Sequence, residues 1–245
     1  MKPGWTAGVT RARLLLSRAV GPTHASEVAA SRSLGDALAA LAGSAYGERV
    51  RAGQELAAAQ RGVAETLLWH LRILAGWLPA PGAALVRALA AWFELVNIDA
   101  HLAALASDGR EPRPFVLGTL AIAWNEAEHA RTAEEVAHAV AGSAWGAPRT
   151  SSPPELALGL RVACARWVKE SAPEAADWVA GAGALLVARE LLVARSGAHA
   201  AQLLLYPGVD QQVLAANTLA ELRSALISQL AGRSPTSRSR LSGGR

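Results

Sequence analysis

Apolar residues recur at spacings of three and four on both sides of a proline-rich break, and this pattern most constrains the fold. The stripe runs through 63–78 before the break and through 85–96 after it. Such spacing puts apolar side chains on one face of an α-helix. The break, WLPAPG at 77–82, interrupts a helix because proline lacks the N–H that a helix interior requires. We therefore expect an antiparallel helical hairpin formed by 55–78 and 83–107.

A second pair of apolar helical segments is expected at 154–171 and 174–196, with a break near Pro173. No run of alternating apolar and polar residues bounded by turn residues predicts a β-strand. Hydrophobic residues make up 51% of the chain and aromatic residues only 5%, so the core must consist mostly of alanine, leucine and valine. The predicted fold class is all-α.

Two stretches of the chain are nearly the same, SLGDALAALAGSAYG at 33–47 and TAEEVAHAVAGSAWG at 132–146. Each begins with a hydroxyl residue three positions before an acid, which is the pattern of a helix-capping box. Each ends with a glycine, which we expect to end the helix in the left-handed conformation. The small residues before it would let another backbone approach, and the aromatic residue would anchor the helix end. This repeated frame comprises Ser33, Asp36, Tyr46 and Gly47 in the first copy, and Thr132, Glu135, Trp145 and Gly146 in the second.

A third copy of the capping frame is expected at Thr218, Glu221 and Gly232. The hairpins also resemble each other, since 98–105 aligns with 187–194 at an offset of 89 residues. We therefore expect pseudo-repeated modules, each made of a short capped helix and a long helical hairpin, with the third module incomplete. The expected division is a first module with an N-terminal helix at 1–130, a second module at 131–206, a partial third at 207–232 and a disordered Ser/Arg-rich tail at 233–245.

The basic charge of the chain is concentrated in that tail. The formal net charge is +4, but 233–245 holds four arginines and no acid, so the rest has 20 basic and 20 acidic residues. Four arginines offer few phosphate contacts, and we expect no nucleic acid partner. The longest uncharged run, 73–86, is too short to cross a bilayer, so a membrane is expected to be contacted only through partners. The single cysteine, Cys164, is expected in the core of a cytosolic protein.

Two Glu-x-x-His pairs, Glu126 with His129 and Glu135 with His138, have the spacing found in carboxylate-bridged di-iron bundles. Such sites need the pairs on different helices together with two further glutamates. Here the pairs lie nine residues apart, and Glu135 also belongs to the capping frame. We therefore expect solvated residues and no metal. A metal-binding helical bundle is kept as an alternative.

A polar group, Asn97, Asp99 and His101, interrupts the leucines of the second hairpin helix. It could form a hydrogen bond between helices or contact a partner. His101 could also approach His70 on the opposite helix. No phosphate-binding glycine loop, nucleophile elbow or pair of zinc cysteines occurs, so no catalytic residue and no cofactor is expected.

The order of several stretches resembles the C/d subunit family of V- and A-type rotary ATPases. They are TRARLLLSRAV at 10–20, the capped stretch at 33–47, FELVNIDAHLAALASDGREPRPFVLGTLAIAW at 93–124 and ALLVARELLVARSG at 184–197. The resemblance implies a funnel-like helical subunit with three pseudo-repeats. Such subunits cap the membrane proteolipid ring, seat the shaft formed by subunits D and F, and have no catalytic residues. This chain would be a shortened member.

The resemblance thus predicts a non-catalytic subunit that couples the shaft to the ring during ion transport, with protons as the expected ion. The predicted location is cytoplasmic, at the periphery of the membrane, as part of the complex. Besides the metalloprotein, a helical adaptor that uses its arginine tail is the other alternative.

Overall fold

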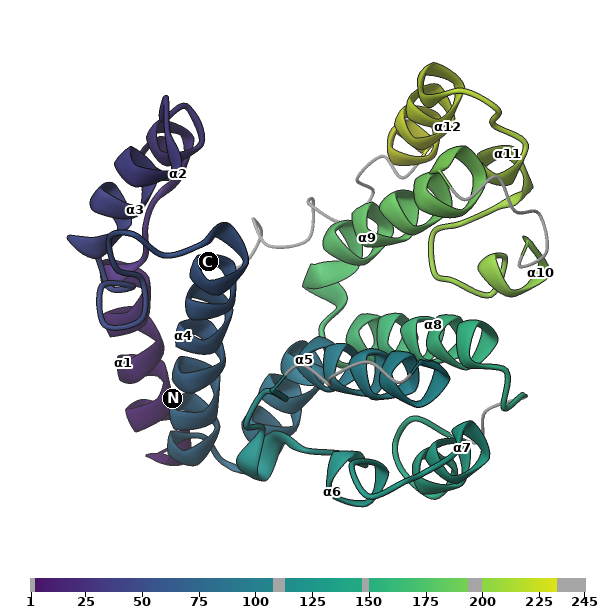
Figure 1. Cartoon of the computed structure of the whole chain (residues 1–245), viewed down its shortest axis with the longest axis horizontal. Helices are drawn as coiled ribbons and strands as arrows, with labels where there is room; N and C mark the ends of the chain where they lie inside the picture. The colour runs from purple at the N-terminus through teal and green to yellow at the C-terminus, as the bar shows by residue number, and fades with distance from the viewer. Residues whose placement is uncertain (1–2, 108–112, 147–149, 194–199, 233–245) are drawn as a thin grey trace, which may run out of the picture. The chain divides into compact units, whose positions relative to one another are not determined.

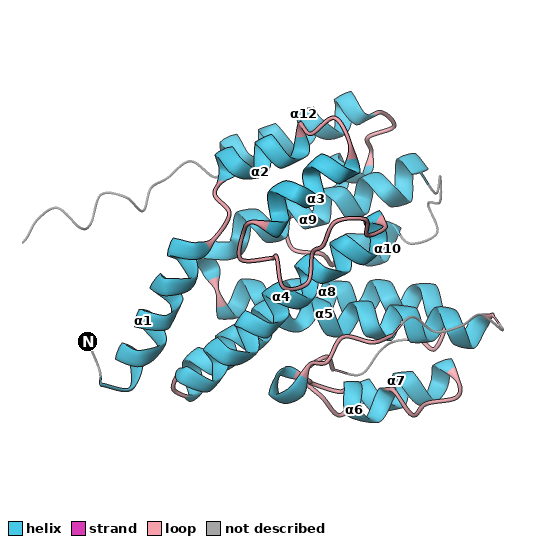
Figure 2. Ribbon diagram, turned by 60° about the vertical axis from the view of Figure 1, so that its left-hand side comes forward, coloured by secondary structure: helices cyan, strands magenta, loops and turns pink. Residues whose placement is uncertain are grey.

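A computed structural model of the chain describes residues 3–107, 113–146, 150–193 and 200–232. Every regular element in these ranges is helical, as Figure 2 shows, which confirms the all-α prediction. The chain divides into two compact units, 1–144 and 145–245. The predicted tail at 233–245 lies outside the described residues. The module boundaries expected at 130 and 206, and the likeness of the modules, stay predictions.

Unit 1 is built on the helical hairpin that the apolar stripes predicted. Its two helices meet at the tight turn of Leu78 and Pro79. The first helix of the chain packs on one side of the hairpin, and two short helices and a 3-10 turn pack on its second helix (Figure 1). The elements are α1 (Pro3–Arg18), α2 (Pro22–Ala29), α3 (Leu34–Ala42), α4 (Leu56–Trp77), α5 (Ala80–Ala106), η1 (Gly118–Leu120), α6 (Trp124–Ala127) and α7 (Ala133–Ala141).

Helix α5 is long and apolar enough to cross a membrane, judged by length and composition alone. No long uncharged run marks it in the sequence, because α5 contains charged residues such as Glu94 and Asp99. In this structure 56% of the apolar window is buried against other parts of the protein, which is the burial of a core helix.

Both repeated stretches form capped helices, α3 and α7. The Ser33 hydroxyl accepts a hydrogen bond from the Asp36 N–H at 3.1 Å, and the Thr132 hydroxyl accepts one from the Glu135 N–H at 3.2 Å. The return bonds differ from a standard capping box. Asp36 accepts from the Ser33 hydroxyl, and Glu135 accepts from the N–H of Arg131, one residue before the cap.

The expected end of these helices, at Gly47 and Gly146, was wrong. Both helices end five residues earlier, at Ala42 and Ala141. Gly146 does adopt a positive φ of 74°, but in the loop beyond the helix, and Gly47 has no positive φ. A Cβ on Gly47 would collide with the carbonyl of Ala42, so this position needs glycine for space.

The C-cap residues are Gly43 and Gly142, and a serine side chain binds a carbonyl near each helix end. The Ser44 hydroxyl donates to the Leu41 carbonyl at 2.6 Å, and the Ser143 hydroxyl donates to the Val140 carbonyl at 2.7 Å. The same two carbonyls also accept the backbone N–H of the serine, at 3.0 Å and 3.2 Å, so each hydroxyl is an additional donor at the helix end. The serine of each Gly-Ser-Ala triplet thus has a role that the sequence analysis did not assign.

The two aromatic residues of the repeated frame make different contacts. Tyr46 packs, half-buried, against the small core cluster of Leu38, Val50 and Ala59. Trp145 is buried in unit 2, where its ring lies edge-to-face with Trp167 at a centroid distance of 6.3 Å. Tyr46 and Trp145 therefore have different packing partners, although the sequences around them are similar.

Unit 2 contains the second hairpin expected from the sequence, interrupted at Pro173. Its short helices pack on the hairpin helices. In the third capping frame the Thr218 hydroxyl accepts from the Glu221 N–H at 3.2 Å, as predicted, but Glu221 accepts from the N–H of Asn217, one residue before the cap. The elements are α8 (Pro153–Ser171), η2 (Pro173–Ala175), α9 (Ala176–Ala188), a π-helical turn η3 (Arg189–Val193), α10 (Ala200–Leu203), α11 (Gln211–Leu214) and α12 (Leu219–Gly232).

Candidate functional site

Three polar side chains of α5 lie on one face of the helix and are buried. Glu94, Asn97 and His101 are separated by three and four residues, so they follow the helical period. Their exposed fractions are 1%, 2% and 7%. A buried polar group is costly unless it is hydrogen-bonded, so each of these residues must have a partner.

Glu94 binds the backbone at the start of α6. Its carboxylate oxygens accept hydrogen bonds from the N–H groups of Ile122, Ala123 and Trp124, with distances of 2.5–2.8 Å. The first N–H groups of a helix have no partner inside it, and a negative charge there is favourable. One carboxylate therefore holds the backbone of three consecutive residues against α5.

Asn97 and His101 bind the same segment of the chain as Glu94 does. Asn97 binds it before residues 122–124, and His101 binds it after them. The Asn97 amide donates to the Phe115 carbonyl at 3.0 Å and accepts from the Phe115 N–H at 2.7 Å. The Nε2 atom of His101 lies 2.9 Å from the Ala130 carbonyl, and its ring contacts Trp124 edge-to-face. We call residues 113–131 the strap, because polar side chains fasten it along the hairpin.

Two arginines fasten the first part of the strap. Arg61 of α4 donates to the Pro114 carbonyl at 3.2 Å, and its guanidinium lies 4.4 Å from the centre of the Phe115 ring. Arg87 of α5 donates to the Thr119 carbonyl at 2.8 Å. Both helices of the hairpin therefore contribute to holding the strap.

The structure separates the polar group that the sequence analysis treated together. Asn97 and His101 direct hydrogen bonds to the chain's own backbone, whereas Asp99 is half-buried and lies on another side of α5. Glu94 was missed, although an acid three residues before Asn97 and seven before His101 was a usable signal. A partner contact by this group stays a prediction.

His70 and His101 lie far apart along the hairpin. His70 lies eight residues before Leu78 and His101 lies 22 residues after Pro79. In an antiparallel hairpin with a rise of 1.5 Å per residue, this places them about 20 Å apart along the axis. The suggested approach of the two imidazoles is therefore wrong.

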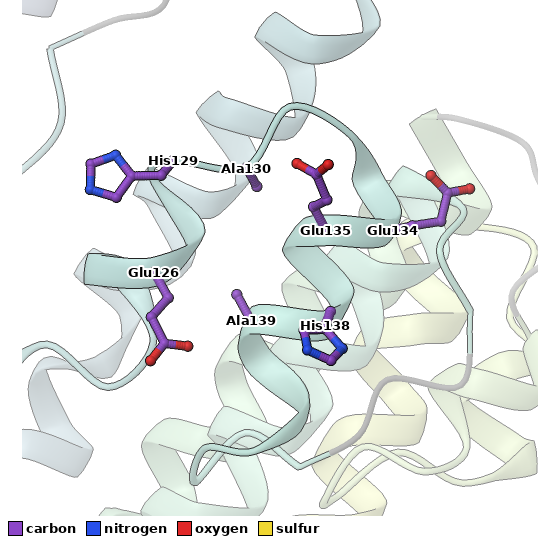
Figure 3. A pocket seen from close by; sticks show the side chains of 7 residues that line it. All are labelled: Glu126, His129, Ala130, Glu134, Glu135, His138 and Ala139. Atoms are coloured by element: carbon purple, nitrogen blue, oxygen red, sulfur yellow. The ribbon is translucent and has the colours of Figure 1, made fainter.

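The two Glu-x-x-His pairs border an open hollow of about 570 Å³ between α6 and α7 (Figure 3). Glu126 and His129 do not share a helix face, because α6 ends at Ala127. Figure 3 shows His129 and His138 on opposite sides of the hollow. All four side chains of the pairs are exposed, and among the described residues no three His, Cys, Asp or Glu side chains could hold a metal ion. The geometry gives the metalloprotein alternative no support.

No protein-family model matches the chain, and no curated protein matches it. The functional argument therefore rests on the sequence motifs and on the contacts of the described residues.

Proposed function

We propose that this chain is a non-catalytic subunit of a V/A-type rotary ATPase that couples the D and F shaft to the proteolipid ring. Its location is then the cytoplasmic face of the membrane, within the complex. Its part in ion transport is mechanical, because torque passes through it as through a stiff body. No residue of the chain performs chemistry in this mechanism.

The observation that carries the proposal is the folding of the stretch with the longest resemblance, 93–124. Glu94 and Asn97 lie at its beginning and bind Phe115 and 122–124 near its end. The described parts of the stretch, 93–107 and 113–124, are thus bound to each other, and these polar side chains serve the architecture. Satisfied buried polar networks make a core rigid and unique, which suits a part that transmits torque.

The capped helices add a second line of support. Hydroxyl residues cap α3, α7 and α12 in the same way, at Ser33, Thr132 and Thr218. The same hydroxyl cap therefore occurs once in each of the three expected modules. This agreement concerns local structure, and the funnel itself belongs to the proposal.

A pull-down from the native cells tests the proposal. The full chain carries an affinity tag, membranes are solubilised in mild detergent, and the recovered proteins are identified by mass spectrometry. We expect subunits D and F and the proteolipid. The Glu94→Gln variant should lower their recovery several-fold, because the carboxamide cannot replace a carboxylate that accepts three N–H groups.

Glu134→Gln is the matched control, since Glu134 is exposed on α7 and should leave recovery unchanged. Circular dichroism of both variants checks that they are folded. If the wild-type chain recovers no ATPase subunit, while the ATPase assembles and pumps in cells that lack the chain, the proposal is wrong.

A further inference from the structure

Unit 1 contains a second hollow, of about 510 Å³, between the end of α1, the turn after α3 and the middle of α4. The first Gly-Ser-Ala triplet, 43–45, forms part of its wall. These small side chains leave space that larger ones would fill. The remaining lining residues are Arg18, Glu48, Arg49, Thr66, Trp69 and His70.

The hollow has an excess of positive charge. Arg18 and Arg49 line it, and Glu48 is the one acid in its lining. Arg49 forms an ion pair with Glu65 at 3.1 Å, but Glu65 also pairs with Arg61 at 2.9 Å, so its single charge is shared. A group with a negative charge would therefore be attracted to this hollow.

His70 adds a hydrogen-bond donor. His70 lines the hollow, and its buried Nδ1 atom has no hydrogen-bond partner, so its imidazole is available to a ligand. Burial lowers the pKa of His70, and Arg11 and Arg18 lower it further, against the opposite effect of Glu48. A bound anion would compensate these two arginines.

The hydroxyl groups around the hollow are already used. Ser44 donates to the Leu41 carbonyl, and Thr66 donates to the Gly62 carbonyl at 2.8 Å. The donors left for a ligand are the guanidinium of Arg18, the free N–H groups of Arg49 and the ring of His70. Arginine forks match the geometry of phosphate oxygens, and they bind them with charge-assisted hydrogen bonds.

We propose that this hollow binds a phosphate group through Arg18, Arg49 and His70. The phosphate is either free inorganic phosphate or the headgroup of an anionic lipid, which present the same oxygens. The site does not depend on the proposed role in the ATPase, because its lining residues differ from Glu94, Asn97 and the strap, on which that proposal rests.

Calorimetric titration of the purified full chain with inorganic phosphate, at constant ionic strength, tests the site. We expect saturable binding that Arg18→Gln and Arg49→Gln each weaken about tenfold, which is the loss of one charge-assisted contact. Glu48→Gln should tighten binding, because it removes the acid from the lining. Arg13→Gln is the matched control, since Arg13 lies on the same helix, is exposed and does not line the hollow.

A vesicle flotation assay distinguishes a lipid headgroup from free inorganic phosphate as the bound group. Flotation with phosphatidic acid vesicles that depends on Arg18, and is absent with phosphatidylcholine alone, identifies a lipid headgroup. Saturable binding of inorganic phosphate without flotation identifies the free anion. The proposal is overturned if neither probe binds, or if Arg18→Gln and Arg49→Gln bind both probes as tightly as Arg13→Gln does. Far-UV circular dichroism of each variant confirms that it is folded.

Discussion

The two long hairpins attach the chain that follows them in opposite ways. At the offset of 89 residues that aligns the hairpins, Glu94 of α5 corresponds to Gly183 of α9. Glu94 holds the strap by hydrogen bonds to three backbone N–H groups. Gly183 instead leaves room for an aromatic ring, since a Cβ there would lie 2.7 Å from ring atoms of Tyr206.

This difference shows that two similar helices can use one position for two physical tasks. A carboxylate supplies directional bonds whose loss leaves buried donors without partners, which is costly. A glycine supplies only shape, and its replacement produces a steric conflict that neighbours can partly relieve. At this aligned position, unit 1 should therefore respond to loss of the polar group, and unit 2 to added volume.

Removal of the Glu94 carboxylate should have the largest effect. Glu94→Ala leaves the N–H groups of Ile122, Ala123 and Trp124 without their acceptor, and we expect a loss of about 4 kcal/mol in the free energy of unfolding. Urea unfolding followed by tryptophan fluorescence measures it. Glu134→Ala, at an exposed position, should change stability by less than about 0.5 kcal/mol. Equal effects of the two variants would contradict the role of Glu94.

The second largest loss of stability is expected when a polar residue of one hairpin is replaced by its counterpart in the other. Asn97 aligns with Leu186, and Asn97→Leu removes both hydrogen bonds to Phe115. We expect a loss of about 3 kcal/mol, because a buried N–H and a buried carbonyl lose their partner. Leu186→Asn is the reverse exchange, and it should fail to create such a bond. Hydrogen exchange of the Phe115 amide measures the local effect, and an unchanged rate in Asn97→Leu would refute it.

Added volume in α9 should have a smaller effect. Gly183→Ala brings a methyl group against Tyr206 and should destabilise the chain by about 2 kcal/mol. Gly181→Ala is the matched control in the same helix. Nothing lies within 4 Å of its added Cβ, so the better helix propensity of alanine should stabilise the helix by about 0.5–1 kcal/mol.

The rate of Cys164 labelling measures the opening of unit 2 in the Gly183→Ala and Gly181→Ala variants. Cys164 is the only cysteine of the chain and is buried in α8. Burial raises the pKa of its thiol to about 12, so the native thiol is unreactive. Labelling by a thiol reagent then requires opening of the unit, and Gly183→Ala should accelerate it by about 30-fold if it costs about 2 kcal/mol. The result would be contradicted by equal labelling rates of Gly183→Ala and Gly181→Ala.

A change of pH should have the smallest effect on stability. The effect should arise in the first hairpin only, since α8 and α9 of the second contain no histidine. The folded pKa of His70 lies below its ordinary value of 6.5 because of burial and of Arg11 and Arg18. As the pH falls below 6.5, the unfolded chain binds a proton that the folded chain does not, so stability decreases. The urea midpoint of wild type should therefore fall more between pH 7 and 5 than that of His70→Gln. His129→Gln, at an exposed position, is the control and should follow wild type.

Much of the fold was predictable, because it depends on neighbours in the sequence. The expected helices 55–78 and 83–107 agree with α4 and α5 to within three residues. The hydroxyl caps at Ser33, Thr132 and Thr218 formed because each needs only the N–H three residues away. The helix ends were missed, since Gly43 and Gly142, the first residues of the two Gly-Ser-Ala triplets, cap α3 and α7 before Gly47 and Gly146 are reached.

The candidate sites were less predictable. Glu94 binds residues 28–30 positions later, and no local pattern shows which backbone segment will reach it. The hollow near His70 combines α1, the turn after α3 and α4, so its residues share no motif. The Glu-x-x-His spacing, which was visible in the sequence, lies on an open surface.

By itself, the sequence determined that this chain is helical, where its long hairpins turn and which hydroxyl groups cap its helices. These features depend on contacts between residues a few positions apart, so they can be inferred from the amino-acid sequence. Only the tertiary structure decided that Glu94 would hold the strap and that Gly183 would receive Tyr206. The reason is that burial, which makes a hydrogen bond necessary and a methyl group too large, arises only when distant segments meet.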